Sequence, residues 1–323
     1  MKSFQYAAPK SLKEAVALLD ESWGKTEVLA GGTDLVTCLK QGLAQPQRVV
    51  SLRNIKELRG LSTKSGALHI GATTTLAELA ENRDVKKLFP ALVTAATGVG
   101  SPQIMNVGTV AGDLCQRPRC WFYRNGFGLL AKDGDTSLAR EGDNRYHAIF
   151  GTDGPALFVS ASSLGPPLIA LGAQVTVAGA GGKTRTLPAA EFFRTPKNDQ
   201  ERETALLANE IVTEISVPLK GLKNATYEVR QRHGLDWPYV TASVAFSVKG
   251  GQLADGQVVL GHVAAVPWLA AAAGQTLQGA PGEALAARCG DAAAQGASPL
   301  SGNAYKVQMV KTAVKRAVVA ASA

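Results

Sequence analysis

The stretch VLAGGTDLV, from Val28 to Val36, decides how the N-terminal part of this chain folds. An apolar run ends at its two glycines, and Thr33 and Asp34 precede what the pattern predicts to be a helix. Glycine lacks a Cβ, so another group can approach this backbone closely, and the first N–H groups of a helix have no partner within it. The stretch therefore predicts a strand-to-helix turn that binds an anion, most often a phosphate. A tight turn without a ligand is the commoner reason for one glycine pair, and the stretch matches neither G-x-G-x-x-G nor a Walker loop.

The residues on either side of this turn predict alternating helices and strands. Ser11 and Glu14 form a capping-box pattern at the start of an amphipathic helix, and Thr75 and Glu78 form a second one. The pattern also predicts strands at 27–30, 48–52 and 67–72, and helices at 35–43 and 89–100. This alternation is typical of α/β units.

A second glycine-containing stretch, SPQIMNVGTVAGDL from Ser101 to Leu114, follows these units. Asn106, Thr109 and Asp113 supply short polar side chains beside Gly108 and Gly112. Two such loops would clamp a ligand with two phosphates, so a dinucleotide suits them better than a single phosphate. A surface loop without a ligand is the alternative. The whole segment 101–155 has weak periodicity and is expected to be a long functional or mobile loop region.

The last part of the chain predicts a different arrangement. Regular structure is expected again at 156–161 and 166–173, then a β-hairpin around Gly179–Gly182 and a strand at 210–219. Beyond a boundary near Pro218–Lys223 come three predicted strands at 225–232, 239–250 and 256–267, followed by helices from Trp268, Glu283 and Ala304. Strands followed by helices indicate a separate α+β domain. We therefore expect two domains, 1–219 and 220–323, the first divided into subdomains of about 1–55 and 56–219.

Composition excludes several classes of protein. The chain has 323 residues, no apolar run long enough for a membrane span and no apolar signal region at its start. A cytoplasmic protein is expected, and export together with a signal-bearing partner is the alternative. The net charge of +8 is dispersed, without the runs or spacings of nucleic-acid-binding motifs, so an anionic ligand or an acidic protein partner explains it better. The four cysteines are too few and scattered for a disulfide framework: Cys38, Cys115, Cys120 and Cys289.

Three of these stretches, LAGGTDL, IGATTTLAEL and QIMNVGTVAGDL, carry a family resemblance in their order and spacing. They resemble the FAD-binding subunit of the xanthine dehydrogenase and carbon monoxide dehydrogenase family of molybdenum hydroxylases. The resemblance covers essentially the whole chain, because YEVRQRHGLDWPYVTASVAF resembles the opening of that family's C-terminal flavoprotein domain. QRPRCWFYRNG and GDNRYHAIFG resemble the subgroup of periplasmic-type aldehyde oxidoreductases and 4-hydroxybenzoyl-CoA reductase.

The resemblance implies an α+β fold: a two-subdomain FAD-binding domain of the vanillyl-alcohol-oxidase or PCMH type, then the C-terminal domain. It implies extended FAD, with its pyrophosphate wrapped by the first loop and with the second loop against the isoalloxazine or diphosphate. The implied FAD contacts are Leu29, Ala30, Gly31, Gly32, Thr33, Asp34, Leu35, Val36, Asn106, Gly108, Thr109, Ala111, Gly112, Asp113, Ser163 and Arg230. No catalytic or metal-binding residue is implied, because the flavin carries the chemistry.

The resemblance also implies two partner subunits. One carries two [2Fe–2S] clusters and the other the molybdopterin that oxidises the substrate, in a heterotrimer or its dimer. This chain contains no molybdopterin or ferredoxin-type cysteine pattern, in agreement with that division. Electrons would leave to an external acceptor, for which NAD, a quinone, a ferredoxin and oxygen all stay open. The substrate belongs to another chain and is not predicted.

Two departures from the family pattern keep alternatives open. Many members have Gly-Gly-Asn where this chain has Ala111-Gly112-Asp113, and Ser-Asp-Leu where it has Ser162-Ser163-Leu164. The second change removes a carboxylate near the flavin. A scaffold subunit that has lost its flavin is therefore one alternative. A stand-alone flavin oxidase or reductase is another, although no catalytic base or covalent flavin anchor stands out.

Other residues in the loop region are weaker candidates. The histidines His69, His147, His233 and His262 are isolated, and we expect packed or hydrogen-bonded roles, with His147 the one in the functional loop. Trp121, Phe122 and Tyr123 would stack on the flavin or a partner, or fill space under a loop. Arg232 and Asp236 are expected to form a solvated ion pair.

Iron is the last question that the sequence raises. Some relatives with the Cys120 and His147 motifs carry an extra [4Fe–4S] cluster, which needs about four thiolates. The loop 115–147 has only Cys115 and Cys120. We therefore predict a shortened loop without iron, with Arg117, Arg119 and Arg124 facing a partner subunit or the flavin phosphates.

Overall fold

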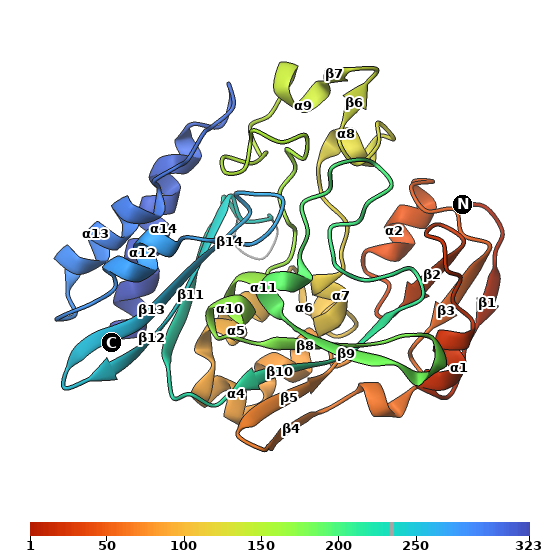
Figure 1. The fold of residues 1–323 in the computed structure, drawn as a ribbon, viewed down its shortest axis with the longest axis horizontal. Coiled ribbons are helices and arrows are strands. Elements are labelled where there is room, and N and C mark those ends of the chain that lie inside the picture. Colours follow the sequence, from red (N-terminus) through yellow and green to blue (C-terminus); the bar gives the residue numbers. More distant parts are fainter. Residues whose placement is uncertain (233–235) are drawn as a thin grey trace.

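The structure is a computed structural model that describes residues 1–232 and 236–323, so the expectation for His233 lies outside the described residues. Figure 1 shows three groups of strands with their helices: the N-terminal group in red, a central sheet below the middle, and the C-terminal group in blue. A fourth, two-stranded ribbon lies in the long loop region. Helices combined with mostly antiparallel sheets make this an α+β fold, as the family resemblance implied.

The N-terminal sheet is small and parallel. Its strand order is β1 (Gln5–Ala7), β3 (Arg48–Ser51) and β2 (Thr26–Leu29), and both outer strands run parallel to β3. The helices of this part are α1 (Leu12–Ala17) and α2 (Leu35–Lys40), with a 3-10 turn η1 (Lys56–Leu58) leading onward. Half of the first predicted capping box forms. Ser11 Oγ accepts from the Glu14 N–H as expected, but the Glu14 carboxylate accepts from the Lys10 N–H in place of the Ser11 N–H.

The central sheet joins residues far apart in the chain. Its order is β4 (Leu61–Lys64), β5 (Ala67–Gly71), β10 (Ile211–Pro218), β8 (Gln174–Ala178) and β9 (Thr184–Pro188), with every pair antiparallel. The predicted hairpin is β8–β9, with η2 (Ala180–Gly182) at its turn. Its helices are α3 (Leu76–Glu81), α4 (Arg83–Leu88), α5 (Pro90–Thr97), α10 (Gly165–Ala170) and α11 (Ala189–Phe192). The second capping box is complete, between Thr75 and Glu78.

The C-terminal part packs helices on an antiparallel sheet. The strands are β11 (Lys223–Val229), β12 (Val240–Lys249), β13 (Gln252–Gly261) and the short β14 (Trp268–Leu269). The helices α12 (Ala271–Thr276), α13 (Glu283–Ala293) and α14 (Tyr305–Ser322) share a core with β12 and β13 (Figure 1). The helix expected from Trp268 starts three residues later, at Ala271, because Trp268 belongs to β14 and pairs with Leu260 of β13.

The long loop region contains only short elements. They are α6 (Pro102–Met105), α7 (Val110–Leu114), α8 (Trp121–Arg124), β6 (Lys132–Asp133), β7 (Thr136–Ser137) and α9 (Leu138–Glu141). The chain forms no helix or strand at 156–161, where regular structure was expected, although most of this apolar segment is buried. This segment packs under the loop region. Its backbone makes isolated hydrogen bonds: the Ala148 N–H donates to Leu157 O, and the Ser160 N–H donates to Ala264 O. Isolated bonds of this kind do not make a β-ladder.

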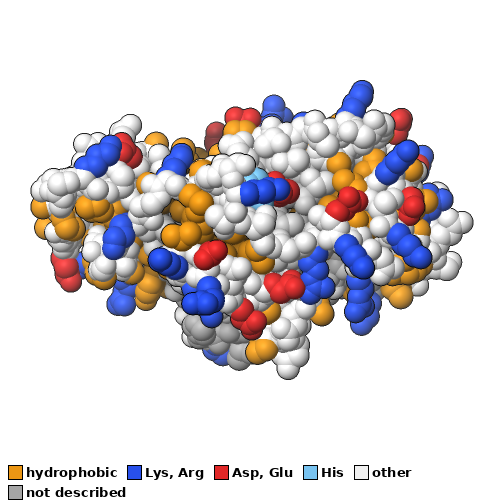
Figure 2. Space-filling view, turned by 90° about the horizontal axis from the view of Figure 1, so that it is seen from below, with side chains coloured by type: hydrophobic (Ala, Val, Ile, Leu, Met, Phe, Trp, Pro, Cys, Tyr) orange, Lys and Arg blue, Asp and Glu red, His pale blue; other side chains and the backbone are white. Residues whose placement is uncertain are grey.

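The surface agrees with a dispersed charge. On the face in Figure 2, Lys and Arg side chains stand apart from one another, with Asp and Glu among them. Of the helices in the described ranges, none has the length and apolar character needed to cross a bilayer.

Candidate cofactor site

The first glycine loop packs directly on the second. A Cβ on Gly31 would lie 1.9 Å from the carbonyl oxygen of Val107, so only glycine permits this approach. Gly32 has a φ of 78°, the left-handed region that favours glycine. Loop packing and turn geometry therefore both demand the two glycines, whatever else binds there. A bulky residue at Gly32 would strain the turn itself.

The same loop presents a row of unused donors. Within the described chain, the N–H groups of Gly31, Gly32, Thr33 and Asp34 donate to no protein acceptor. Unpaired backbone donors are uncommon unless water or a ligand satisfies them. The helix that follows, α2, has only six residues, so the binding capacity lies in the loop backbone more than in a helix dipole.

The third of these motifs, IGATTTLAEL, holds the second loop in place. The Leu76 N–H donates to Gly108 O at 2.9 Å, and the Val110 N–H donates to Thr74 O at 2.9 Å. Thr109 caps α7, its hydroxyl accepting from the Gly112 N–H at 3.1 Å. The three motifs of the sequence thus meet in one place, and each has a physical task.

Two adjoining cavities open beside these loops. The first, here called the loop cavity, has a volume of about 270 Å³ and lies between the first loop, α7 and the segment 202–212. The second, the junction cavity, has about 260 Å³ and extends toward Gly98, Ser163 and Trp237. They share the lining residues Thr33, Asp34, Thr109, Gly112 and Gln116. Side by side, the two cavities make up the space along both glycine loops.

Most of the predicted FAD contacts line this space. Those that line one or both cavities are Ala30, Gly31, Gly32, Thr33, Asp34, Leu35, Gly108, Thr109, Ala111, Gly112, Asp113 and Ser163. Leu29, Val36, Asn106 and Arg230 line neither. Leu29 and Val36 pack over Gly32, and Asn106 is exposed beside Val107.

Arg230 has a different task from the predicted one. Its buried guanidinium pairs with Glu228 and donates to Gly98 O at 2.7 Å. A Cβ on Gly98 would force both of those side chains to shift. Arg230 therefore connects β11 to the end of α5, which forms a wall of the junction cavity. Burial raises the pKa of Glu228 to about 7, against the effect of Arg230.

Asp113 and the Ser162–Leu164 turn, the two departures from the family pattern, lie in contact. The Asp113 carboxylate accepts from Ser162 Oγ at 2.6 Å and from the N–H of Leu164 at 2.8 Å. Gln116 Nε2 donates to it at 3.0 Å. Burial raises the pKa of Asp113, and these hydrogen bonds oppose that rise. The carboxylate missing at Ser163 is thus replaced by one that reaches the same turn from α7.

Asp34 contacts Arg117, Arg119 and Arg124, which were predicted to face a partner subunit or the flavin phosphates. Its carboxylate pairs with Arg124 at 2.9 Å and Arg119 at 2.8 Å, and accepts from the Arg117 backbone N–H at 2.7 Å. The Arg117 side chain pairs with Glu203 at 2.9 Å. All three arginine side chains are mostly buried. Arg117 and Arg119 still line the loop and junction cavities respectively.

The aromatic and histidine candidates separate into two groups. Tyr123 lines the loop cavity beneath Arg117 and Arg124, whereas Trp121 stands edge-on to His147 away from it. His147 Nε2 lies 3.2 Å from Cys120 Sγ. His69 pairs with Glu214, and His262 is buried against Thr241, so both are hydrogen-bonded as expected. Arg232 and Asp236 form the predicted ion pair.

Some cavity residues carried no signal in the sequence. Arg202 and Glu203 line the loop cavity from a segment almost 170 residues after the first loop. Trp237 closes the junction cavity and lies under the Arg119 guanidinium, 4.9 Å from ring centroid to Cζ. These contacts are long-range in sequence, so no local pattern could have assigned these residues to the site.

The row of free N–H donors and the two adjoining cavities suit an elongated anionic cofactor. Residues 2–220 match the FAD-binding domain in molybdopterin dehydrogenase, and residues 225–321 match the CO dehydrogenase flavoprotein C-terminal domain. The chain therefore belongs to the family of FAD-binding subunits of molybdopterin dehydrogenases, and FAD is its cofactor.

Individual relatives agree over nearly the full chain. The aldehyde oxidoreductase FAD-binding subunit PaoB of Escherichia coli is 30% identical over 87% of this chain and 88% of its own length. The carbon monoxide dehydrogenase medium chain of Hydrogenophaga pseudoflava is 30% identical over 98% of this chain and 96% of its own. A solved structure of that dehydrogenase superposes with a TM-score of 0.77 at 29% identity, covering 99% of this chain and 97% of the other.

Proposed function

We propose that FAD lies along the loop and junction cavities, with its pyrophosphate on the N–H groups of Gly31 to Asp34. The observation that carries this proposal is the row of four donors without a protein acceptor, beside a space lined by both glycine loops. Hydrogen bonds to a charged acceptor contribute roughly 1.5–3 kcal/mol each, so this row is a strong site for a diphosphate. The predicted contacts that line the cavities are proposed as the binding residues.

The protein positions the cofactor and tunes its surroundings. When bound, FAD takes up and releases electrons, which is chemistry that no side chain supplies. Thr33, Thr109 and Gly112 separate the two cavities and would hold the middle of the molecule. Asp113 and Arg119 line the junction cavity, where we place the isoalloxazine, and bring one anion and one cation to it.

The chain acts as the electron-transfer subunit of a molybdenum hydroxylase complex. Relatives carry the names FAD-binding subunit and medium chain, which indicates multi-subunit enzymes. We propose a [2Fe–2S] subunit as electron donor and a molybdopterin subunit as the site of substrate oxidation, in a heterotrimer or its dimer. We also propose a division at 219–220 between cofactor and C-terminal domains, and assembly in the cytoplasm, where the four free thiols stay reduced.

A substitution between the cavities tests the proposal. Thr33 is exposed and lines both cavities, so Thr33→Trp should fill the passage with little strain on the fold. Thr37→Trp, one turn along α2 and also exposed, is the matched control. We expect about one FAD per chain in the wild type and control by visible absorption, and a colourless Thr33→Trp with unchanged circular dichroism. A wild-type protein that stays colourless in excess FAD would leave only the flavin-free scaffold.

A further inference from the structure

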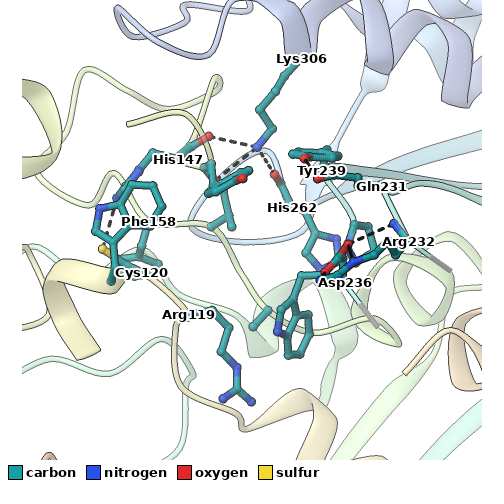
Figure 3. Close-up of a pocket in the computed structure, with 16 residues that line it drawn as sticks. Arg119, Cys120, His147, Phe158, Gln231, Arg232, Asp236, Tyr239, His262 and Lys306 are labelled. Atoms are coloured by element: carbon teal, nitrogen blue, oxygen red, sulfur yellow. Dashed lines mark hydrogen bonds and ion pairs between the residues drawn. The ribbon is translucent and has the colours of Figure 1, made fainter. Parts of the chain in front are cut away.

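Charged side chains line every cavity along this chain's cofactor site, and most of them already have partners. A third cavity of about 370 Å³ lies next to the junction cavity. Figure 3 shows Lys306 in its wall donating to backbone carbonyls, and Arg232 paired with Asp236. Arg119, the other cation in this wall, pairs with Asp34 at 2.8 Å. The cations of this cavity are therefore occupied by the protein itself.

The loop cavity contains an ion pair of a different kind. Glu27 and Arg202 both line this cavity and do not line the junction cavity. Glu27 Oε1 lies 3.5 Å from Arg202 Nη2, and the two side chains are 21% and 16% exposed. Among the described residues, neither the carboxylate nor the guanidinium has a hydrogen-bond partner beyond this loose contact. Mostly buried charged groups normally have such partners, so this pair is open to a ligand.

Both members of the pair are held in fixed positions. The Arg202 guanidinium lies over the ring of Trp23, with Cζ 4.5 Å from the ring centroid, an arrangement that leaves its edge donors free. Glu27 belongs to β2, where it pairs with Val49 of β3. Burial raises the pKa of Glu27, and Arg117 opposes the rise. A carboxylate that has lost water in this way gains from a donor on a ligand.

A donor and an acceptor side by side match one base better than another. Adenine has an amino donor next to a ring-nitrogen acceptor, whereas guanine has two acceptors, O6 and N7, on the corresponding edge. Arg202 can donate to the ring nitrogen of adenine while Glu27 accepts from its amino group. Guanine would set O6 against the Glu27 carboxylate and leave that buried acceptor without a donor, which is the source of strong selectivity in such sites.

The pair also lies at a suitable place along the chain. Glu27 precedes Gly31 by four residues, and an extended chain of that length spans about 13 Å at most. The two side chains are therefore within reach of a nucleoside whose diphosphate lies on the N–H groups of Gly31 to Asp34.

We propose that Glu27 and Arg202 select the base of the cofactor, with Arg202 donating to a ring nitrogen of adenine and Glu27 accepting from the adenine amino group. This inference rests on the proposed function, because it assigns the adenosine half of FAD to the loop cavity. It makes the chain selective for adenine over guanine nucleotides. It also makes the chain selective for FAD over FMN, which has no adenine.

Selection of the base can be measured without turnover. ADP and GDP carry the same diphosphate, so calorimetric titration of each into the purified subunit, after removal of its FAD, compares the bases alone. We expect ADP to bind at least about tenfold more tightly than GDP. Glu27→Gln keeps the shape of the side chain, but its amide can donate to O6, so the ratio should fall severalfold with unchanged circular dichroism. ADP that binds no more tightly than GDP, or not at all, would overturn the proposal.

A second variant tests the other member of the pair. Arg202→Met removes the donors and keeps an apolar side chain against Trp23. Arg194→Met is the matched control, because Arg194 is exposed and lines neither cofactor cavity. We expect FAD to bind about tenfold more weakly to Arg202→Met than to the control, and FMN to bind both equally.

The outcomes of this second test are distinct. An unchanged FAD affinity in Arg202→Met would overturn the proposal, and so would an equal loss of FAD and FMN, because Arg202 would then contact a phosphate. A wild-type subunit that binds neither flavin would count against the proposed function instead.

Discussion

Gly31 and Val107 bring the two glycine loops into direct contact, since a Cβ on Gly31 would stand 1.9 Å from the Val107 oxygen. The contact has a functional consequence, because the unpaired N–H groups of the first loop then face a space bounded by the second. Packing between the loops is therefore what gives the cofactor site its shape.

Gly31→Ala should separate the loops and damage both the fold and the site. We expect a loss of a few kcal/mol in the free energy of unfolding, in line with overpacking of a rigid contact, and a fall in bound FAD. Gly154→Ala is a suitable control, because the nearest atom to its Cβ would be 4.0 Å away and its φ is not positive. Urea unfolding and the absorption spectrum measure the two effects. Equal stability of both variants would contradict the packing role of Gly31.

Asp34→Asn should break the ion pairs of the arginine cluster beneath the first loop and lower the stability of the protein. The neutral amide leaves Arg119 and Arg124 without their shared anion, and both arginines are mostly buried. Breaking such a pair by removing one partner costs about 3–5 kcal/mol when it is fully buried, and somewhat less here. Glu283→Gln, which removes an exposed partner of Lys315, should cost less than about 1 kcal/mol and serves as the control. Thermal unfolding of both variants distinguishes the two cases.

The features that could be predicted from the sequence are those that depend on residues close together in the chain. The second capping box, the β8–β9 hairpin and both glycine loops follow from local patterns, and the structure has them where they were expected. The insertion of β10 between β5 and β8, and the link between Asp34 and Arg124, are long-range contacts that no periodicity reports. Arg230 lay near a family motif, yet its buried contact with Gly98 depends on how α5 packs against β11.

The carboxylate that contacts the 162–164 turn comes from Asp113, whereas many family members have an aspartate at the position of Ser163. A double-mutant cycle tests whether one carboxylate takes the place of the other. Asp113→Asn places an amide against the N–H donors of the 162–164 turn, and Ser163→Asp adds a second buried anion beside the first. Each single change should lower stability by about 1–3 kcal/mol. The double variant restores one carboxylate and should be more stable than the sum predicts by over about 1 kcal/mol. Strict additivity, measured by urea unfolding, would show that the two positions are independent.

Acid should destabilise the protein through two buried histidines. Burial, with the nearby Lys306 ammonium, lowers the pKa of His147 to about 4 and that of His262 to about 3. The unfolded chain, with a histidine pKa of about 6.5, therefore binds more protons than the folded chain as the pH falls. This stability is present above about pH 6.5 and is lost on the way down to about pH 4 for His147 and about pH 3 for His262. Each histidine adds up to about 1.4 kcal/mol per pH unit in that window.

Variants separate these histidines from the carboxylates that also titrate in acid. Unfolding free energies at pH 7, 6 and 5 should fall less steeply in His147→Gln and in His262→Asn than in the wild type. Both changes together should flatten the profile further. A slope that is the same in all four proteins would mean that the two rings are charged in the folded state.

The last prediction concerns iron in the loop 115–147, which the sequence predicts to be without a cluster. The structure disperses the four thiols: Cys38 Sγ accepts from Arg124, Cys120 lies 3.2 Å from His147 Nε2, and Cys289 is buried in α13. Cys115 lines the loop cavity, and burial raises its pKa to about 12, so it stays a thiol. Across residues 1–232 and 236–323, no three His, Cys, Asp or Glu side chains stand close enough to hold a metal ion. We expect less than about 0.2 iron atoms per chain after anaerobic purification, with FAD bound, and the same FAD content in Cys120→Ser. Stoichiometric iron and acid-labile sulfide that disappear in Cys120→Ser would prove this wrong, and would require the loop to rearrange around a cluster.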